Sequence, residues 1–126
     1  MSKKWREELE RILKDMESGD PDIESSAIVR TDGLVMASAL PKSADEGLIA
    51  AMSAAILNIG SRALGELAKG ELEKIIVSGD KGDITIMGVG REAVLSAITR
   101  PGANIGLLLV EMTRARERIE ALLKAM

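Results

Sequence analysis

The chain has 126 residues, of which 46% are hydrophobic, and its 17 basic and 20 acidic residues give a formal net charge of −3. This length and apolar content are typical of one compact domain with its own core, and they exclude a disordered chain. Cysteine and histidine are absent, which excludes disulfides, thiolate nucleophiles, zinc sites with those ligands and imidazole acid–base catalysis. Trp5 is the only aromatic residue, so the core must be aliphatic.

The charged residues are spread along the chain, and no basic block is interleaved with aromatic residues, so we expect no nucleic-acid binding. No apolar run approaches the roughly 18 residues of a membrane span, so we also expect no membrane insertion. The N-terminal stretch MSKKWREELE is charged and helical in pattern, unlike the apolar segment of a signal peptide. We therefore expect a cytoplasmic protein.

The first expected element is an amphipathic helix over residues 3–18. Apolar residues at helical spacing form one stripe there, namely Trp5, Leu9, Ile12, Leu13 and Met16. The helix is expected to end at Ser18-Gly19-Asp20-Pro21, where glycine supplies a cap and proline prevents continuation.

A β-hairpin is expected next, from the β-type runs 25–30 and 34–40 on either side of Asp32-Gly33. An Asp-Gly pair between two such runs is a strong hairpin signal, because a type I′ turn needs two residues with positive φ. Asp32 is therefore interpreted as a turn former and not as a catalytic carboxylate.

A long helix follows, with Ser43 and Glu46 interpreted as a capping box and Gly70 as the residue that closes the helix after Lys69. At about 100° per residue, one face gathers the larger aliphatic residues, and we expect this face to cover the sheet. Its members are Ile49, Met52, Ile56, Ile59, Ala63 and Leu67. Much of the remaining circumference is small and smooth, which would let another backbone approach closely.

Three strands, residues 72–78, 83–89 and 93–99, and a last helix over residues 107–126 complete the chain. The resulting order is α-ββ-α-βββ-α. A five-stranded, mostly antiparallel sheet with helices on both faces would bury every apolar stripe, so the sequence predicts an α/β/α fold.

Two glycine-rich stretches, Gly79-Asp80-Lys81-Gly82 and Gly88-Val89-Gly90, invite a phosphate-binding interpretation. A P-loop must precede a helix, whereas both stretches join strands to strands, so hairpin turns are favoured. Asp80 and Asp83 flank a hairpin tip and are interpreted as residues of an exposed turn. We assign no catalytic residue, no cofactor and no metal site, and the pattern favours a binding module.

The hairpin AIVRTDGLVMASA, the alanine-rich long helix, the three strands and the stretch RPGANIGLLLVEMTRA together resemble the roadblock or dynein light-chain-seven family. The resemblance covers residues 5–124 and identifies residues 1–126 as a single roadblock-like domain. It implies a sheet order of 2-1-5-4-3. It also implies a homodimer in which the third strands join edge to edge and the long helices lie side by side.

Members of this family are not enzymes themselves, and they regulate or scaffold Ras-like small GTPases or serve as dynein light chains. The resemblance therefore implies a non-catalytic homodimeric regulator or adaptor that binds a Ras-like small GTPase and modulates its nucleotide state or localisation. Two alternatives stay open. One is a structural scaffold subunit without effect on nucleotide turnover, and the other is a small-ligand sensor.

Two sets of residues are expected to carry this function. The expected dimer interface consists of Ser53, Leu57, Gly60, Leu64, Leu72, Lys74 and Ile76. The expected partner-binding surface consists of Ala50, Ala54, Asn58, Ser61 and Arg62.

Overall fold

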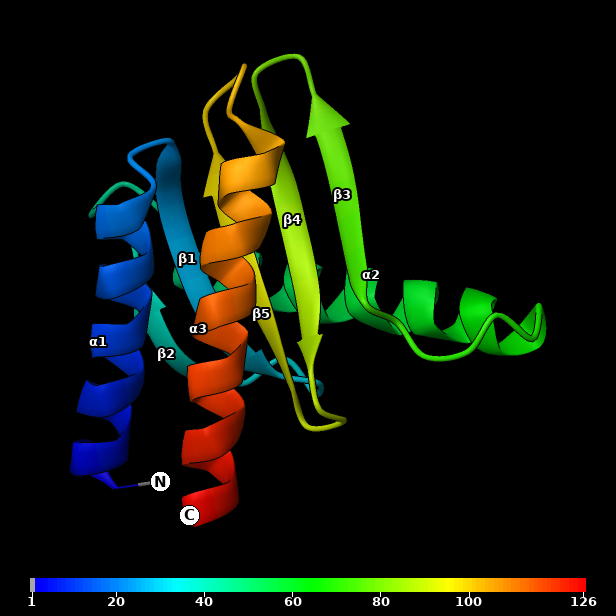
Figure 1. Cartoon of the computed structure of the whole chain (residues 1–126), viewed down its shortest axis with the longest axis horizontal. Helices are drawn as coiled ribbons and strands as arrows, with labels where there is room; N and C mark the ends of the chain where they lie inside the picture. Colours follow the sequence, from blue (N-terminus) through cyan, green and yellow to red (C-terminus); the bar gives the residue numbers. More distant parts are fainter. Residues whose placement is uncertain (1) are drawn as a thin grey trace.

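The computed structural model describes residues 2–126 and contains the eight predicted elements in the predicted order (Figure 1). They are α1 (Lys3–Gly19), β1 (Ile23–Arg30), β2 (Val35–Ala39), α2 (Glu46–Glu66), β3 (Lys74–Gly79), β4 (Gly82–Val89), β5 (Ala93–Thr99) and α3 (Ile105–Ala125). All neighbouring strands pair antiparallel, in the order β2-β1-β5-β4-β3. The predicted fold class and the sheet order implied by the family resemblance are confirmed.

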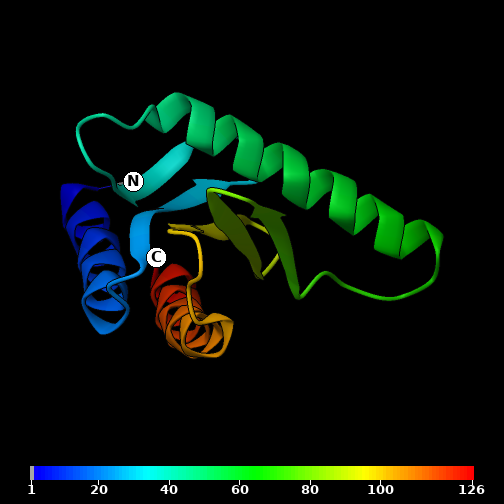
Figure 2. The same ribbon diagram turned by 90° about the horizontal axis from the view of Figure 1, so that it is seen from above.

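Helices cover both faces of the sheet, with α1 and α3 on one face and α2 on the other (Figure 2). On the first face, Leu9 and Leu13 of α1 pack with Leu95 of β5 and with Leu108 and Met112 of α3. All of these side chains are aliphatic, as the near absence of aromatic residues requires. Trp5, at the start of the α1 stripe, is only half-buried.

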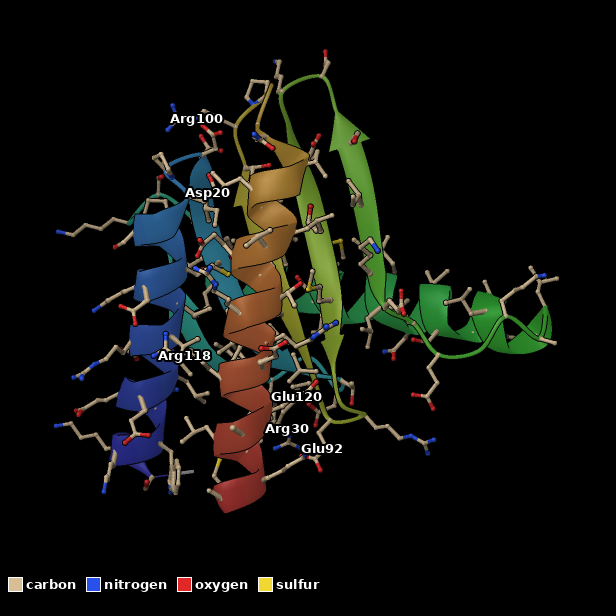
Figure 3. The ribbon with its side chains drawn as sticks, viewed as in Figure 1. Asp20, Arg30, Glu92, Arg100, Arg118 and Glu120 are labelled. Atoms are coloured by element: carbon tan, nitrogen blue, oxygen red, sulfur yellow. The ribbon has the colours of Figure 1, made fainter. Side chains whose placement is uncertain are left out.

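An ion pair also links α1 and α3 on this face. Arg118 of α3 lies 2.9 Å from Asp15 of α1, measured between Nη1 and Oδ2, and both side chains are about half exposed (Figure 3). At the end of the sheet where α1 stops, Arg100 donates to the backbone oxygen of Pro21 at 2.9 Å. Exposed contacts of this kind contribute little to stability, so the aliphatic core must fix how the helices pack.

The first hairpin forms as predicted, but its turn is of a different type. The Gly33 amide donates to the Arg30 oxygen at 2.9 Å, and the Arg30 amide donates to the Leu34 oxygen at 2.8 Å. Gly33 has a φ of 93°, whereas Asp32 has no positive φ. The loop therefore has three residues and places a left-handed glycine after a type I turn, so the predicted type I′ turn is wrong. Asp32 acts as a turn former, since its Oδ1 accepts from the Leu34 amide at 3.3 Å.

The predicted capping box at the start of α2 is also wrong. Asp45 is the N-cap, with its Oδ1 accepting from the Leu48 amide at 3.1 Å. Glu46 does not reach back to its own helix, because its carboxylate accepts from the Ser38 hydroxyl of β2 at 2.6 Å. A strong local N-cap and a contact with the neighbouring strand together displace the Ser43 cap.

The end of α2 lies nearer the N-terminus than predicted. The helix ends at Glu66, and Ala68, with a φ of 55°, takes the left-handed position that the sequence assigns to Gly70. The Lys69 amide donates to the Leu64 oxygen at 2.8 Å, which is the bond that closes a Schellman-type helix end. The chain then needs several residues to return to the sheet, and β3 begins at Lys74 instead of Leu72.

Glu17 is a half-buried carboxyl between α1 and β1. Burial raises its pKa above the ordinary value, and the hydrogen bond that it accepts from the Ser26 hydroxyl opposes this rise. A carboxyl whose pKa is higher in the folded chain than in the unfolded chain binds more protons when folded. The folded protein therefore loses stability as the pH rises through the interval between the two pKa values.

We predict that Glu17→Gln, which keeps the shape and removes the charge, gains stability relative to the wild type as the pH rises from about 4 to about 7. The measurement is urea unfolding at both pH values, with Glu24→Gln on the exposed side of β1 as the control. A stability difference for Glu17→Gln that is the same at both pH values would contradict this account.

Candidate functional site

The helix α2 packs on the sheet through its smallest residues. Ala50 and Ala54 are buried, and the Ser53 hydroxyl donates to the Ser96 hydroxyl of β5 at 3.0 Å in an environment closed to water. Leu57 completes this face. Small side chains allow a close approach of the helix backbone to the sheet, and the buried pair of hydroxyls satisfies both partners only in this orientation.

This packing corrects the predicted orientation of α2 in part. The residues expected to cover the sheet form what we call the aliphatic stripe: Ile49, Met52, Ile56, Ile59, Ala63 and Leu67. Ile49 and Ile56 are half-buried and pack against the sheet as predicted. Met52, Ile59 and Leu67, however, are 48%, 72% and 70% exposed. The sheet side is filled by Val29, Ile86 and Val94, so Ala50 and Ala54 fit closely against it, with Leu57 as the one large fully docked side chain of α2.

The helix is also longer than the sheet that it covers. Its C-terminal half runs out beyond β3, as seen from both directions in Figures 1 and 2. Among the described residues, α2 is long and apolar enough by length and composition to cross a membrane, yet only 22% of that stretch is buried in the molecule. Because α2 is docked on a sheet through Ser53, this composition indicates an uncovered packing surface, and the absence of membrane insertion stays a prediction.

The strand next to this overhang, β3, is an edge of the sheet. Within residues 2–126 it pairs with β4 alone, and Ile76 and Val77 are exposed. The opposite edge, β2, is shorter, lies beside a register shift between Ile28 and Val29, and is followed by Pro41. Short length, irregular pairing and proline are features that block edge-to-edge association, and so are charged side chains. Of these features β3 has only one, the lysine at position 74.

Three of the seven residues expected at a dimer interface are misplaced. Ser53 and Leu57 are buried inside the subunit and have no surface to offer a second copy. Gly60 faces its own chain, because a Cβ atom there would lie 2.5 Å from Ile75 Cδ1 and 2.9 Å from Leu72 Cδ1. These three residues contribute to the packing of α2 within its own subunit. Their assignment to the dimer interface is therefore wrong. Leu64 and Leu72 are half-buried and Lys74 and Ile76 are exposed, so these four stay candidates.

The expected partner surface divides in the same way. Ala50 and Ala54 of α2 are buried between the helix and the sheet and cannot touch a partner. Their assignment to the partner surface is therefore wrong. Asn58, Ser61 and Arg62 are exposed. At about 100° per residue Asn58 and Ser61 lie on the side of α2 away from the aliphatic stripe, whereas Arg62 borders it at about 60° from Ile59. A surface there and a surface on the stripe can therefore be occupied at the same time.

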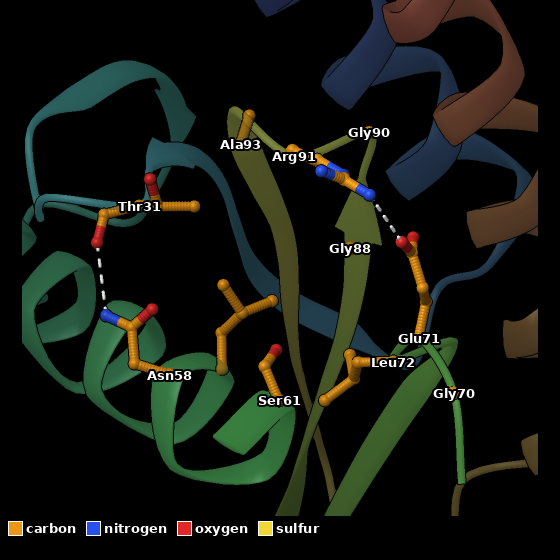
Figure 4. Close-up of a pocket in the computed structure, with 11 residues that line it drawn as sticks. Thr31, Asn58, Ser61, Gly70, Glu71, Leu72, Gly88, Gly90, Arg91 and Ala93 are labelled. Atoms are coloured by element: carbon orange, nitrogen blue, oxygen red, sulfur yellow. Dashed lines mark hydrogen bonds and ion pairs between the residues drawn. The ribbon is translucent and has the colours of Figure 1, made fainter. Parts of the chain in front are cut away.

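Asn58 and Ser61 line a hollow of about 360 Å³, which we call the Asn58 hollow (Figure 4). Six segments build it: the β1–β2 turn, α2, the α2–β3 connection, the end of β4, the β4–β5 turn and the start of β5. Its residues are Thr31, Leu57, Asn58, Ser61, Gly70, Glu71, Leu72, Gly88, Gly90, Arg91 and Ala93.

Two polar contacts define the shape of the Asn58 hollow. The Asn58 amide nitrogen donates to the Thr31 backbone oxygen at 3.2 Å, which ties α2 to the first hairpin. At the rim, Arg91 Nη2 lies 2.9 Å from Glu71 Oε1, and these side chains are 88% and 77% exposed. The hollow thus combines a polar wall, an apolar floor of leucines and an exposed ion pair across its mouth.

Among residues 2–126, no group of three or more acidic, histidine or cysteine side chains is placed to hold a metal ion. The candidate surfaces described above, the stripe with β3 and the hollow, are not built around such a group.

The pattern for a Roadblock/LC7 domain matches residues 9–99, from the middle of α1 to the end of β5. The chain belongs to the Roadblock/LC7 family. Its sequence relatives include the Methanocaldococcus jannaschii proteins MJ1340 and MJ0310. They are 34% and 33% identical to it over 114 residues, covering 90% of this chain and 98% of each relative.

Solved structures of the family share the whole architecture. MglB of Myxococcus xanthus superposes with a TM-score of 0.90 over 99% of this chain and 93% of its own, at 15% identity. The gliding protein MglB of Thermus thermophilus gives 0.88 over 100% and 96%, at 14% identity. A Roadblock/LC7 domain of Streptomyces avermitilis gives 0.86 over 91% and 97%, at 17% identity. At such identities the likeness establishes the fold alone.

Several residues of this Roadblock/LC7 chain escape sequence reasoning. Met52 and Ile59 look like core residues because they are large and aliphatic. Glu71 and Arg91 lie 20 residues apart and meet only after the chain has folded. The sequence gives only indirect signals of these roles. For Met52 and Ile59 the signal is the presence of two apolar faces on one helix, and for Arg91 it is the pair of glycines, Gly88 and Gly90, at the end of a strand.

We predict that Ser53→Ala destabilises the fold, because it leaves the buried Ser96 hydroxyl without its partner, at a cost of about 1–3 kcal/mol. The double variant Ser53→Ala/Ser96→Ala should lose less than the sum of the single changes, since both hydroxyls are removed together. Urea unfolding at one fixed protein concentration measures this. Strictly additive losses would show that the two hydroxyls do not depend on each other.

Proposed function

We propose that this chain is a non-catalytic homodimeric adaptor that binds a Ras-like small GTPase and modulates its nucleotide state or localisation. The single observation that carries the proposal is the exposed part of the aliphatic stripe of α2, namely Met52, Ile59 and Leu67, together with the unpaired edge of β3. The proposal assigns no catalytic residue, in keeping with a sequence that lacks histidine and cysteine.

A second copy of this chain would cover the exposed residues of α2 and pair the free edge of β3 in one symmetric contact. Joining β3 to β3 of a second copy pairs the backbone groups of both edges. The same two-fold arrangement brings the overhanging half of each α2 against its counterpart, because the overhang and the edge lie on the same side of the subunit. Burial of one fully exposed isoleucine or leucine contributes about 1.5–3 kcal/mol. Ile59 and Leu67 of two copies would supply four such side chains.

The small GTPase is proposed on the strength of family membership, which is an analogy and not a property of any one residue. What supports it in this chain is the availability of a second surface. Asn58, Ser61 and Arg62 are exposed, Asn58 and Ser61 on the side of α2 away from the stripe and Arg62 at its border. In the proposed dimer they stay accessible, so self-association and partner binding do not compete.

We predict that Ile59→Glu converts the dimer to a monomer, because two carboxylates would be buried without partners at the two-fold contact. Leu34→Glu, at an exposed leucine of the β1–β2 hairpin, is the matched control and should remain a dimer. Sedimentation velocity over a range of protein concentrations measures the dissociation constant. The dimer proposed here is ruled out by a wild type that is monomeric throughout, or by an Ile59→Glu dimer of unchanged affinity.

A second prediction concerns the partner. Arg62→Ala should weaken binding of the GTPase and leave the dimer intact, because Arg62 pairs only with Glu66 of its own helix, at 3.1 Å. The assay follows nucleotide hydrolysis and exchange by Ras-like small GTPases of the source organism, with and without this chain. A GTPase that binds without any change in turnover would favour the scaffold alternative. Absence of binding to every such GTPase would overturn the adaptor proposal.

A further inference from the structure

Beside α2, the sheet has a row of aliphatic side chains that the helix does not fully cover. The strand register places Ile98 of β5 opposite Ile84 of β4, and Ile84 opposite Val77 of β3. Ile84 packs at the margin of the cluster beneath α2, and paired residues of antiparallel strands share a face, so all three lie on the α2 face. Ile84 and Ile98 are half-buried and Val77 is 45% exposed. We call Val77, Ile84 and Ile98 the open row.

The open row lies along the aliphatic side of α2. Ile98 pairs with Ser25 near the start of β1, whereas Asn58 of α2 is tied to Thr31 after the end of β1. The Asn58 side of the helix therefore faces away from the open row, and the opposite side, which includes Ile56, faces it. The open row thus continues the apolar surface of α2 as far as the free edge of β3.

The overhanging end of α2 carries a leucine that lies beyond the sheet of its own subunit. Leu57 is buried against the sheet, and Leu64, seven residues later, lies on the same side of the helix. Between them, Gly60 marks the place where α2 crosses β3, because a Cβ atom there would lie 2.5 Å from Ile75 Cδ1. Since β3 is the last strand of the sheet and the helix runs on past it, Leu64 has left its own sheet behind (Figure 2).

The length of the overhang corresponds to two strands. After Gly60, residues 61–66 remain in α2, and at 1.5 Å per residue they extend about 9 Å. Neighbouring strands lie about 4.8 Å apart. The overhang is therefore long enough to lie over β3 and β4 of a second copy joined at the β3 edge, and too short to reach Ile98 on β5.

We infer that the overhang of each α2 covers the open row of a second copy, with Leu64 of one subunit packed against Val77 and Ile84 of the other. The inference rests on the proposed β3–β3 dimer and adds a separate contact to it, in which a helix of one subunit packs on the sheet of the other. Each subunit thereby completes the apolar packing of its partner.

The symmetry of the β3–β3 contact brings the helix to this row. Because paired residues share a face, the two-fold axis passes through a residue of β3 and not between two residues. An axis at Ile76 pairs Ile75 with Val77 of the second copy, two β-branched residues on the α2 face, whereas an axis at Val77 would place Ile75 opposite Gly79. With the axis at Ile76, the α2 of the second copy crosses above Val77 and runs on toward Ile84.

Two other arrangements define the outcomes of the test. In one, the overhang packs only against the α2 of the second copy and leaves the open row exposed. In the other, the open row receives a helix of an unrelated protein. The second copy is the favoured occupant because the open row ends at Val77, on the same edge that the β3–β3 contact uses.

The test cross-links one position of the overhang to one position of the open row. The natural sequence has no cysteine, so Leu64→Cys and Ile84→Cys each carry a single thiol. The two variants are unfolded together in urea, refolded and oxidised. Because a disulfide requires Cα atoms within about 7 Å, we expect a covalent dimer to form in the mixture at least about ten times faster than in either variant alone.

The matched control replaces Ile84→Cys with Asp83→Cys. Asp83 is the preceding residue of β4 and therefore points to the opposite face of the sheet. Its mixture with Leu64→Cys should form a covalent dimer no faster than the single variants do.

A truncation gives an independent measurement. Leu64→Ala should raise the dissociation constant of the dimer at least about tenfold, because each dimer loses two leucine side chains from the contact. Leu48→Ala, at an exposed leucine near the start of the same helix, should leave the dissociation constant unchanged. Sedimentation velocity measures both.

Cross-linking no faster than in the control, in a protein that sediments as a dimer, would overturn the inference and leave the β3–β3 dimer standing. An unchanged dissociation constant for Leu64→Ala would overturn it as well. Failure of the proposed dimer has a different signature, because the wild type would then sediment as a monomer and both contacts would fall together. None of these measurements involves a GTPase, so they are independent of the turnover assay.

Discussion

The close packing of α2 on the sheet is the contact on which the rest of the structure depends. Ala50, Ser53 and Ala54 bring the helix down onto the strands, and the buried hydrogen bond between Ser53 and Ser96 fixes its rotation. Once that rotation is set, Met52 and Ile59 of the aliphatic stripe lie outside the core, while Ile49 and Ile56 pack at its margin. The same rotation places Asn58 and Ser61 at the hollow on the other side of the helix. One helix thereby presents an apolar surface on one flank and a polar surface on the other.

The fold could be predicted almost completely because its signals are local and agree with one another. The Asp32-Gly33 turn, the glycines between β3, β4 and β5, and the period of the apolar residues all indicate the same elements. The local errors lie where two signals compete. Ser43 and Asp45 are both good N-cap residues, and the helix begins after Asp45. Glu46 then binds Ser38, eight residues earlier in the sequence, and does not complete a capping box with Ser43. Ends and turn types depend on such contacts more than element identity does.

The site could be predicted only in part, and the reason is physical. Periodicity finds two apolar faces on α2 but cannot say which one the sheet accepts, since that depends on the volume that the strands leave free. Val29, Ile86 and Val94 fill much of that volume, and the hydrogen bond from Ser53 to Ser96 sets the rotation, so Met52 and Ile59 are left outside. Asn58, Ser61 and Arg62 were expected on a surface of the long helix, and all three are exposed. The Glu71–Arg91 pair could not be foreseen, because it joins two loops whose meeting requires the finished sheet.

The central claim is that β3 meets β3 of a second copy, and cross-linking of single cysteines tests it most directly. The natural sequence has no cysteine, so a variant with one cysteine at each position from 74 to 78 in turn reports only on that position. A disulfide requires Cα atoms within about 7 Å, a distance met in paired strands only close to the two-fold axis. The account predicts rapid oxidation to a covalent dimer that peaks at one β3 position and falls off on both sides, with none for Leu34→Cys. Equal and slow cross-linking at every position, no faster than at Leu34→Cys, would contradict it.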